Sequence, residues 1–167
     1  MPRCHKADGR HRRLRVETGS TISKMDKQTI EAPTDDDITS IARALIHADN
    51  VCKETLGAAL DGTRADLARI QQVVESGFVA REATYTLQAL GMAFGKVFVN
   101  ENTGYDWWMV QDEYGRDPAI RYQQTTLLAF PRTMLSKRVE DGDPIDVSDL
   151  YDHLKERLST LINDGYT

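Results

Sequence analysis

The sequence predicts an α+β fold in which helices cover one face of an antiparallel sheet. Three observations lead to this prediction. Apolar residues recur at three- and four-residue spacing both before residue 96 and after residue 131. Between these regions, short β-prone runs alternate with turn residues. The connections between those runs are short, which favours antiparallel neighbours. The predicted order is a helical hairpin plus a third helix, a four-stranded antiparallel meander, and two C-terminal helices.

The first two helices are predicted as a hairpin. Thr34 precedes three acids, an order typical of a helix N-terminus, where a side-chain oxygen caps free N–H groups. An apolar stripe then predicts a helix of about 26 residues that ends at Asp61-Gly62. Thr63, with Asp66 three residues later, predicts the cap of a second helix that ends at Ser76-Gly77. The short glycine-containing turn indicates that the two helices are antiparallel.

A third helix is predicted from about Arg81 to Gly95. Gly91 and Gly95 lie on one side of it, four residues apart. Because glycine costs roughly 1 kcal/mol in a helix interior, this pair needs a reason. We expect close approach of another backbone, from the sheet that follows. A ligand facing the bare backbone is the alternative.

Four strands are then predicted, over residues 97–99, 107–111, 119–122 and 125–130. The second and third flank a turn from Asp112 to Pro118, in which Gly115 can take a positive φ. Pro131 ends the last strand, and a short helix is predicted over 132–140. Asp146 or Ser148 then caps a final amphipathic helix.

Charge is unevenly distributed along the chain. The whole sequence has a net charge of -5, whereas residues 1–28 carry eight Lys or Arg and three acids, which leaves -10 for the remainder. We interpret residues 1–33 as a disordered basic arm and residues 34–167 as a single α+β domain. Met25 is a second plausible start, which would leave residues 1–24 untranslated. Nucleic-acid binding by the arm is disfavoured, because the arm lacks interleaved aromatic residues.

The sequence also indicates where in the cell the protein is located. No apolar run approaches the roughly 18 to 20 residues that span a bilayer, and the N-terminus lacks the apolar region of a secretory signal. We therefore expect a cytoplasmic protein without a membrane partner. Cys4 and Cys52 match neither a disulfide framework nor a zinc site, and Cys52 is expected to be a small buried residue.

The acidic turn is the main candidate for chemistry. Asp112, Glu113 and Asp117 lie within six residues and could hold a hard cation or perform acid–base work. Their spacing does not match an EF-hand loop, and Asp is common in turns because it bonds the turn backbone. We favour a solvated turn whose carboxylates cap N–H groups or pair with Arg116 and Arg121. No other catalytic constellation is recognised, so we predict no catalytic residue, no metal and no cofactor.

Two further features extend the candidate surface. Trp107 and Trp108 are adjacent, so in a strand they face opposite sides of the sheet. One would fill the core, and the other would either form a protein-binding hot spot or be covered by another segment. Lys137 and Arg138 would be salt-bridge partners of the acidic turn or the second wall of a groove. The candidate binding surface is Trp107, Trp108, Asp112, Glu113, Arg116, Asp117, Arg121, Lys137 and Arg138.

Three motifs carry a resemblance to a known family. They are LGMAFG at 90–95, the run from Trp107 to Ala119 that contains DEYGRDPA, and FPRTMLSKRVE at 130–140. Together they resemble a bacterial uncharacterised family, domain of unknown function 3806, over about Leu90 to Leu154. The family has no assigned activity, so the resemblance implies relatives and not a reaction.

Function is therefore an open choice between two classes. We expect a non-enzymatic module that binds another protein, because the body is acidic, the tryptophans are paired and no catalytic constellation is present. An immunity protein that neutralises a basic nuclease toxin is one concrete version, since an acidic surface would steer it toward such a partner. The alternative is a ligand- or metal-binding domain, or an enzyme, that uses the DEYGRDP turn.

Overall fold

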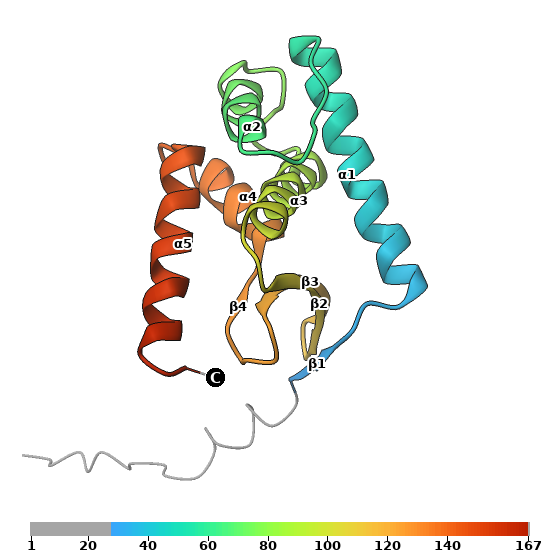
Figure 1. The fold of residues 1–167 in the computed structure, drawn as a ribbon. Coiled ribbons are helices and arrows are strands. Elements are labelled where there is room, and N and C mark those ends of the chain that lie inside the picture. The colour runs from blue at the N-terminus through green and yellow to red at the C-terminus, as the bar shows by residue number, and fades with distance from the viewer. Residues whose placement is uncertain (1–27, 167) are drawn as a thin grey trace, which may run out of the picture.

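The computed structural model describes residues 28–166 and confirms the α+β class. Within that range it contains five helices and a four-stranded sheet, with the helices gathered on one side of the sheet (Figure 1). The elements are β1 (Thr29–Glu31), α1 (Asp35–Leu56), α2 (Ala65–Glu75), α3 (Thr84–Glu101), β2 (Tyr105–Asp112), β3 (Gly115–Tyr122), β4 (Leu128–Ala129), α4 (Pro131–Asp141) and α5 (Val147–Asn163).

The sheet is one long hairpin with a short strand on each edge. Its order is β1-β2-β3-β4, and every neighbouring pair is antiparallel. β2 and β3 pair along their whole length, from Tyr105 opposite Tyr122 to Asp112 opposite Gly115. β1 pairs with only three residues of β2, and β4 with only two residues of β3. The hairpin therefore sets the face of the sheet that the helices cover.

Helix α3 is the centre of the molecule. It lies between α1 on one side and α4 and α5 on the other (Figure 1), and most of its side chains are buried. Phe98 lies 5.3 Å from the Tyr151 ring of α5 and 5.0 Å from the Tyr105 ring of β2, measured between centroids. The Asn102 amide donates to the Tyr151 hydroxyl over 2.8 Å and satisfies this buried polar pair.

The predicted strand at 97–99 is wrong, because α3 continues through it to Glu101. Val97 and Phe98 are both completely buried. On a strand, two adjacent side chains would face opposite sides, whereas a central helix offers packing partners all around. Burial therefore overrides the β propensity of this segment.

The fourth strand of the sheet is instead β1 (Thr29–Glu31), which lies within residues 1–33, the segment predicted to be a disordered basic arm. Residues 1–27 of that segment lie outside the described range.

Helix ends follow local chemistry, with two corrections. Thr34 caps α1 as predicted, since its hydroxyl accepts from the Asp37 N–H and Asp37 accepts from the Thr34 N–H. The helix ends at Leu56 and not at Asp61, because Gly57 adopts φ 68° and closes the C-terminus. Asp146 caps α5 through the Asp149 N–H at 2.8 Å, one of the two predicted caps.

The start of α2 differs from the predicted capping box. Arg64 occupies the cap position without a side-chain bond. Asp66 is buried and folds back to accept from the N–H groups of Asp61 and Gly62 and from Arg69. The carboxylate therefore stabilises the preceding loop and not the first turn of the helix.

The two glycines of α3 mark a close approach, as predicted, but the approaching segment is the start of α4. A Cβ on Gly91 would meet the carbonyl oxygens of Pro131 and Arg132. A Cβ on Gly95 would lie 2.7 Å from both the Pro131 ring and the Trp107 ring. The sheet contributes the Trp107 side chain to this contact. Cys52 is buried as expected, and burial raises the pKa of its thiol to about 11.

Candidate functional site

A pocket of about 400 Å³ opens between α1, α3 and the hairpin, and we call it the arginine pocket. Its floor is apolar and its rim is polar. The floor and walls contain Ile41, Ala44, Ala89, Met92, Met109 and Pro118, and the rim contains Asp37, Ser40, Arg43, Tyr85, Gln88, Arg116 and Arg132. Five separate elements, α1, α3, β2, β3 and α4, supply these side chains, so the pocket exists only in the folded chain.

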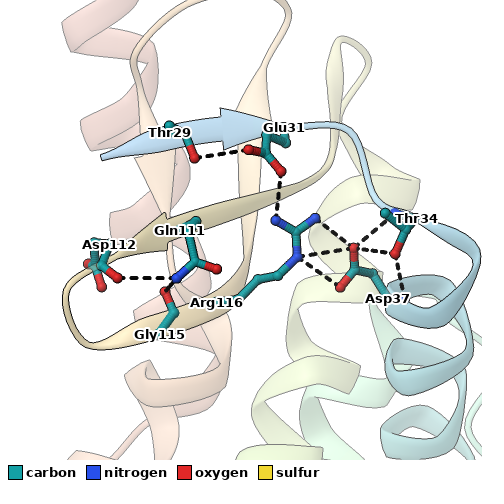
Figure 2. A network of polar contacts seen from close by, with 8 residues as sticks. All are labelled: Thr29, Glu31, Thr34, Asp37, Gln111, Asp112, Gly115 and Arg116. Atoms are coloured by element: carbon teal, nitrogen blue, oxygen red, sulfur yellow. Dashed lines mark hydrogen bonds and ion pairs between the residues drawn. The ribbon is translucent and has the colours of Figure 1, made fainter. Parts of the chain in front are cut away.

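Arg116 joins three elements at one end of this pocket (Figure 2). It lies opposite Gln111 in the hairpin register and donates from Nη2 to the Asp37 carboxylate of α1 at 2.8 Å. Its Nη1 donates to Glu31 of β1, also at 2.8 Å. Asp37 in turn belongs to the cap of α1. One guanidinium therefore ties β3, β1 and the start of α1 together, and this explains why so short an edge strand is held in place.

The network fixes the protonation of its two acids. The Arg116 guanidinium, and then the Thr34 N–H, hold the pKa of Asp37 well below its ordinary value of 3.8. The bond from Arg116, and then the Thr29 hydroxyl, lower the pKa of Glu31 from 4.5. Asp37 is thus a fully bonded carboxylate near neutral pH. It offers no transferable proton to the pocket, and both of its oxygens already accept hydrogen bonds.

Arg132 of α4 also lines the pocket. It is the second residue of α4, and its Nε donates to Gln88 of α3 at 3.1 Å. Its Nη1 donates to Asp117 of β3 at 2.9 Å. The close packing of α4 on Gly91 brings Arg132 to this position, since Gln88 and Gly91 lie on successive turns of α3.

The remaining polar groups of the rim can all donate hydrogen bonds. Within residues 28–166, the Ser40 hydroxyl, the Arg43 guanidinium and the Tyr85 hydroxyl have no hydrogen-bond or ion-pair partner, and Gln88 uses only its carbonyl oxygen. The Tyr85 ring packs against His47 at 4.9 Å. A pocket whose acid is already bonded, and whose free groups can all donate and include the Arg43 guanidinium, is suited to a ligand that carries acceptors, above all an anion.

The two tryptophans lie on opposite faces of the sheet. Trp107 pairs with Ile120 and packs toward the core, whereas Trp108 pairs with Ala119 on the other face. Trp108 lies under the Arg121 guanidinium, 4.4 Å from the ring centroid. Arg121 also donates to the Gln124 carbonyl, so the pair anchors the loop that leads to β4.

The acidic turn is a two-residue hairpin loop, shorter than the predicted turn from Asp112 to Pro118, because residues 115–118 pair with β2 as the start of β3. Asp112 accepts from the Tyr114 N–H at 2.8 Å, and Gly115 takes φ 135°. The predicted pairing of the turn acids with Arg116 and Arg121 is wrong, because β3 begins at Gly115 and alternation sends Arg116 to the face that meets α1. In the described part of the chain, no group of three or more His, Cys, Asp or Glu side chains is arranged to hold a metal ion.

The second candidate segment does not reach the pocket. Lys137 and Arg138 are exposed on α4, and Arg138 donates to the Met134 carbonyl at 2.6 Å. The predicted pairing of these two residues with the acidic turn is therefore replaced by the contact between Arg132 and Asp117. Of the candidate surface residues, Arg116 lines the pocket, while Asp117 contributes indirectly by bonding Arg132.

Comparison with known proteins identifies the family. The model of the family described as "Domain of unknown function (DUF3806)" matches residues 66–151. The chain belongs to this family. The matched region supplies the pocket residues of α3, β2, β3 and α4, whereas Asp37, Ser40, Arg43 and the rest of α1 lie outside it.

A solved structure shows the same fold. It is the crystal structure of a protein from Bacteroides thetaiotaomicron VPI-5482 at 1.50 Å, with a TM-score of 0.73 and 21% identity. The alignment covers 78% of this chain and 48% of that one, so this chain spans about half of the solved protein. No curated protein matches the chain. In the described range, no helix combines the length and apolar character that a membrane crossing requires.

Sequence reasoning identified Arg116 and missed the pocket around it. Ser40, Arg43, Tyr85 and Gln88 lie on the polar sides of predicted helices. A polar side that faces solvent and one that faces a pocket have the same periodicity, so no signal in one sequence separates them.

Acid should weaken this fold through the Arg116 network. Because the folded state lowers the pKa of Glu31 and Asp37, the network stabilises the protein above their ordinary values of 4.5 and 3.8. That stabilisation is lost as pH falls through the lowered values. We expect Tm to fall below about pH 4.5 more steeply in the wild type than in Arg116→Gln. Lys137→Gln removes a positive charge outside the network and should behave like the wild type. If Tm fell equally with pH in the wild type and in Arg116→Gln, the network would not be the cause of the acid sensitivity.

Proposed function

We propose that this protein is a non-enzymatic module that recognises another protein at the arginine pocket. One observation carries the proposal: an apolar floor is surrounded by free hydrogen-bond donors and by three arginines. Such a pocket can receive a side chain and fix its orientation through the rim, which is how a small concave site binds specifically.

The residue types at the pocket support a protein as the partner. Tyr, Met and Arg are enriched in protein interfaces, and Tyr and Arg are among the residues that most often dominate the binding energy. Here Arg43 and Tyr85 are exposed at the rim, and Tyr85 keeps 56% of its surface accessible. Met92 and Met109 line the floor. A partner segment could therefore bury an anchor residue on the methionines and cover Tyr85.

The chemistry of the rim favours an acidic partner segment. The immunity-protein version is supported by a different feature, the net charge of -10 on residues 29–167, which would attract a basic partner. The two versions make opposite predictions about the charge of the contacting segment. The pocket favours the acidic segment, because the charged group of the rim that has no ion-pair partner in the described range is the Arg43 guanidinium.

Site-specific photo-crosslinking tests the proposal. A photoreactive phenylalanine analogue replaces either Tyr85 or Tyr166, which are matched in exposure at 56% and 58%. Tyr166 lies beyond the end of α5, away from the pocket. In native cells we expect a discrete protein adduct at position 85, its loss when Arg43→Glu is added, and no such adduct at position 166. Equal adducts at both positions, or none at position 85, would overturn the proposal.

A further inference from the structure

We infer that the arginine pocket is a carboxylate site that takes one carboxylate on an apolar stem. Arg43, Ser40 and Tyr85 would bind the carboxylate, and Met92 and Met109 would contact the stem. The inference deepens the proposed function and rests on it for the claim that the pocket is the binding site. It adds the chemical class of the group that enters.

The charges of the rim favour a ligand group that carries a single negative charge. Arg116 is paired with Asp37 and Glu31, and Arg132 is paired with Asp117. Among the pocket residues in the described range, Arg43 is the arginine that no carboxylate accompanies. The three arginines and their acids Asp37, Glu31 and Asp117 sum to zero, so a carboxylate adds one negative charge to a neutral rim, whereas a phosphate group adds about two near neutral pH.

The donors around Arg43 are placed to share that carboxylate. Ser40 and Arg43 are three residues apart on α1, so their side chains are neighbours on one side of the helix. Tyr85 of α3 lines the same pocket, and its ring packs against His47. A carboxylate can accept two bonds from a guanidinium and still accept from hydroxyl groups.

The apolar floor of the pocket favours a ligand whose carboxylate is attached to an apolar stem. Ala89, Met92 and Met109 line the pocket although at most 4% of each residue is exposed. They contribute no polar group to satisfy a ligand. A volume of about 400 Å³ lies near the lower end of ligand pockets, so it suits a side chain or a short acid. The carboxylate could come from a glutamate side chain, from the C-terminus of a partner or from a free short-chain acid.

Binding of hexanoate, hexyl phosphate and hexylamine to the whole chain tests the inference by calorimetry and by chemical-shift changes. We expect hexanoate to bind more tightly than hexyl phosphate and hexylamine not to bind. Arg43→Gln should weaken hexanoate binding by about tenfold or more, as expected for losing hydrogen bonds to a charged group. Arg157→Gln removes an exposed arginine of α5 and should leave hexanoate binding unchanged. Ser40→Ala should give a smaller loss than Arg43→Gln.

Three versions of one short peptide then identify the source of the carboxylate. They have a free C-terminus, an amidated C-terminus, or an amidated C-terminus with an internal glutamate.

The inference would be overturned if hexylamine or hexyl phosphate bound more tightly than hexanoate, or if Arg43→Gln left the affinity for hexanoate unchanged. If hexanoate does not bind but the crosslink at position 85 is observed, the carboxylate assignment is wrong and the proposed function is still supported. If the crosslink is also absent, both fall.

Discussion

Replacing Phe98 with alanine is expected to lower the free energy of unfolding by about 3–5 kcal/mol. Phe98 is completely buried, and its ring contacts the rings of Tyr105 and Tyr151. The substitution removes burial of a large ring and leaves a cavity where α3, β2 and α5 meet. Because domains are stable by only about 5–15 kcal/mol, this loss would bring the protein close to unfolding at room temperature.

Urea denaturation of wild type, Phe98→Ala and Phe78→Ala measures this effect. Phe78 is 59% exposed, so the same chemical change there should cost within about 0.5 kcal/mol. A loss below about 1 kcal/mol for Phe98→Ala would contradict the central position of α3. It would also reopen the question of whether residues 97–99 belong to a helix at all.

Gly91→Ala is expected to destabilise the protein by about 2 kcal/mol or more, although alanine is the better helix former. In an open helix, the change would stabilise by roughly 1 kcal/mol. Here the new Cβ meets the carbonyl oxygens of Pro131 and Arg132, which belong to backbone and cannot rotate away. Helix α4 must therefore shift. Since Arg132 lines the arginine pocket, hexanoate binding should weaken together with stability.

The decisive measurement is whether Gly91→Ala raises or lowers the free energy of unfolding. Ala42 lies exposed in the middle of α1, and Ala42→Gly supplies the helix-propensity baseline, a loss of roughly 1 kcal/mol. A gain of similar size for Gly91→Ala would show that α4 does not press on α3. Gly95→Ala should also destabilise the protein, because its new Cβ lies 2.7 Å from the Pro131 ring, which is closed onto the backbone, and 2.7 Å from the Trp107 ring.

The sequence predicted the parts of the site that depend on neighbours in the chain. The sequence predicted the Thr34 cap, a turn that begins at Asp112 and a helix over 132–140, which the structure extends to 131–141. Their bonds join residues a few positions apart. The motif around Arg116 was also recognised. Its partners were not, because Asp37 and Glu31 lie 79 and 85 residues away and only the hairpin register decides which face Arg116 takes.

By itself, the sequence determined the α+β class, the family and most helix boundaries. Each of these rests on periodicity, caps and turn residues, which act within a few residues of the chain. Only the tertiary structure decided that residues 97–99 are helical, that Thr29–Glu31 completes the sheet and that donors of α1 and α3 surround one pocket. These outcomes depend on what surrounds a segment after folding. The free energy of burying Val97 and Phe98 on all sides exceeds their local preference for a strand.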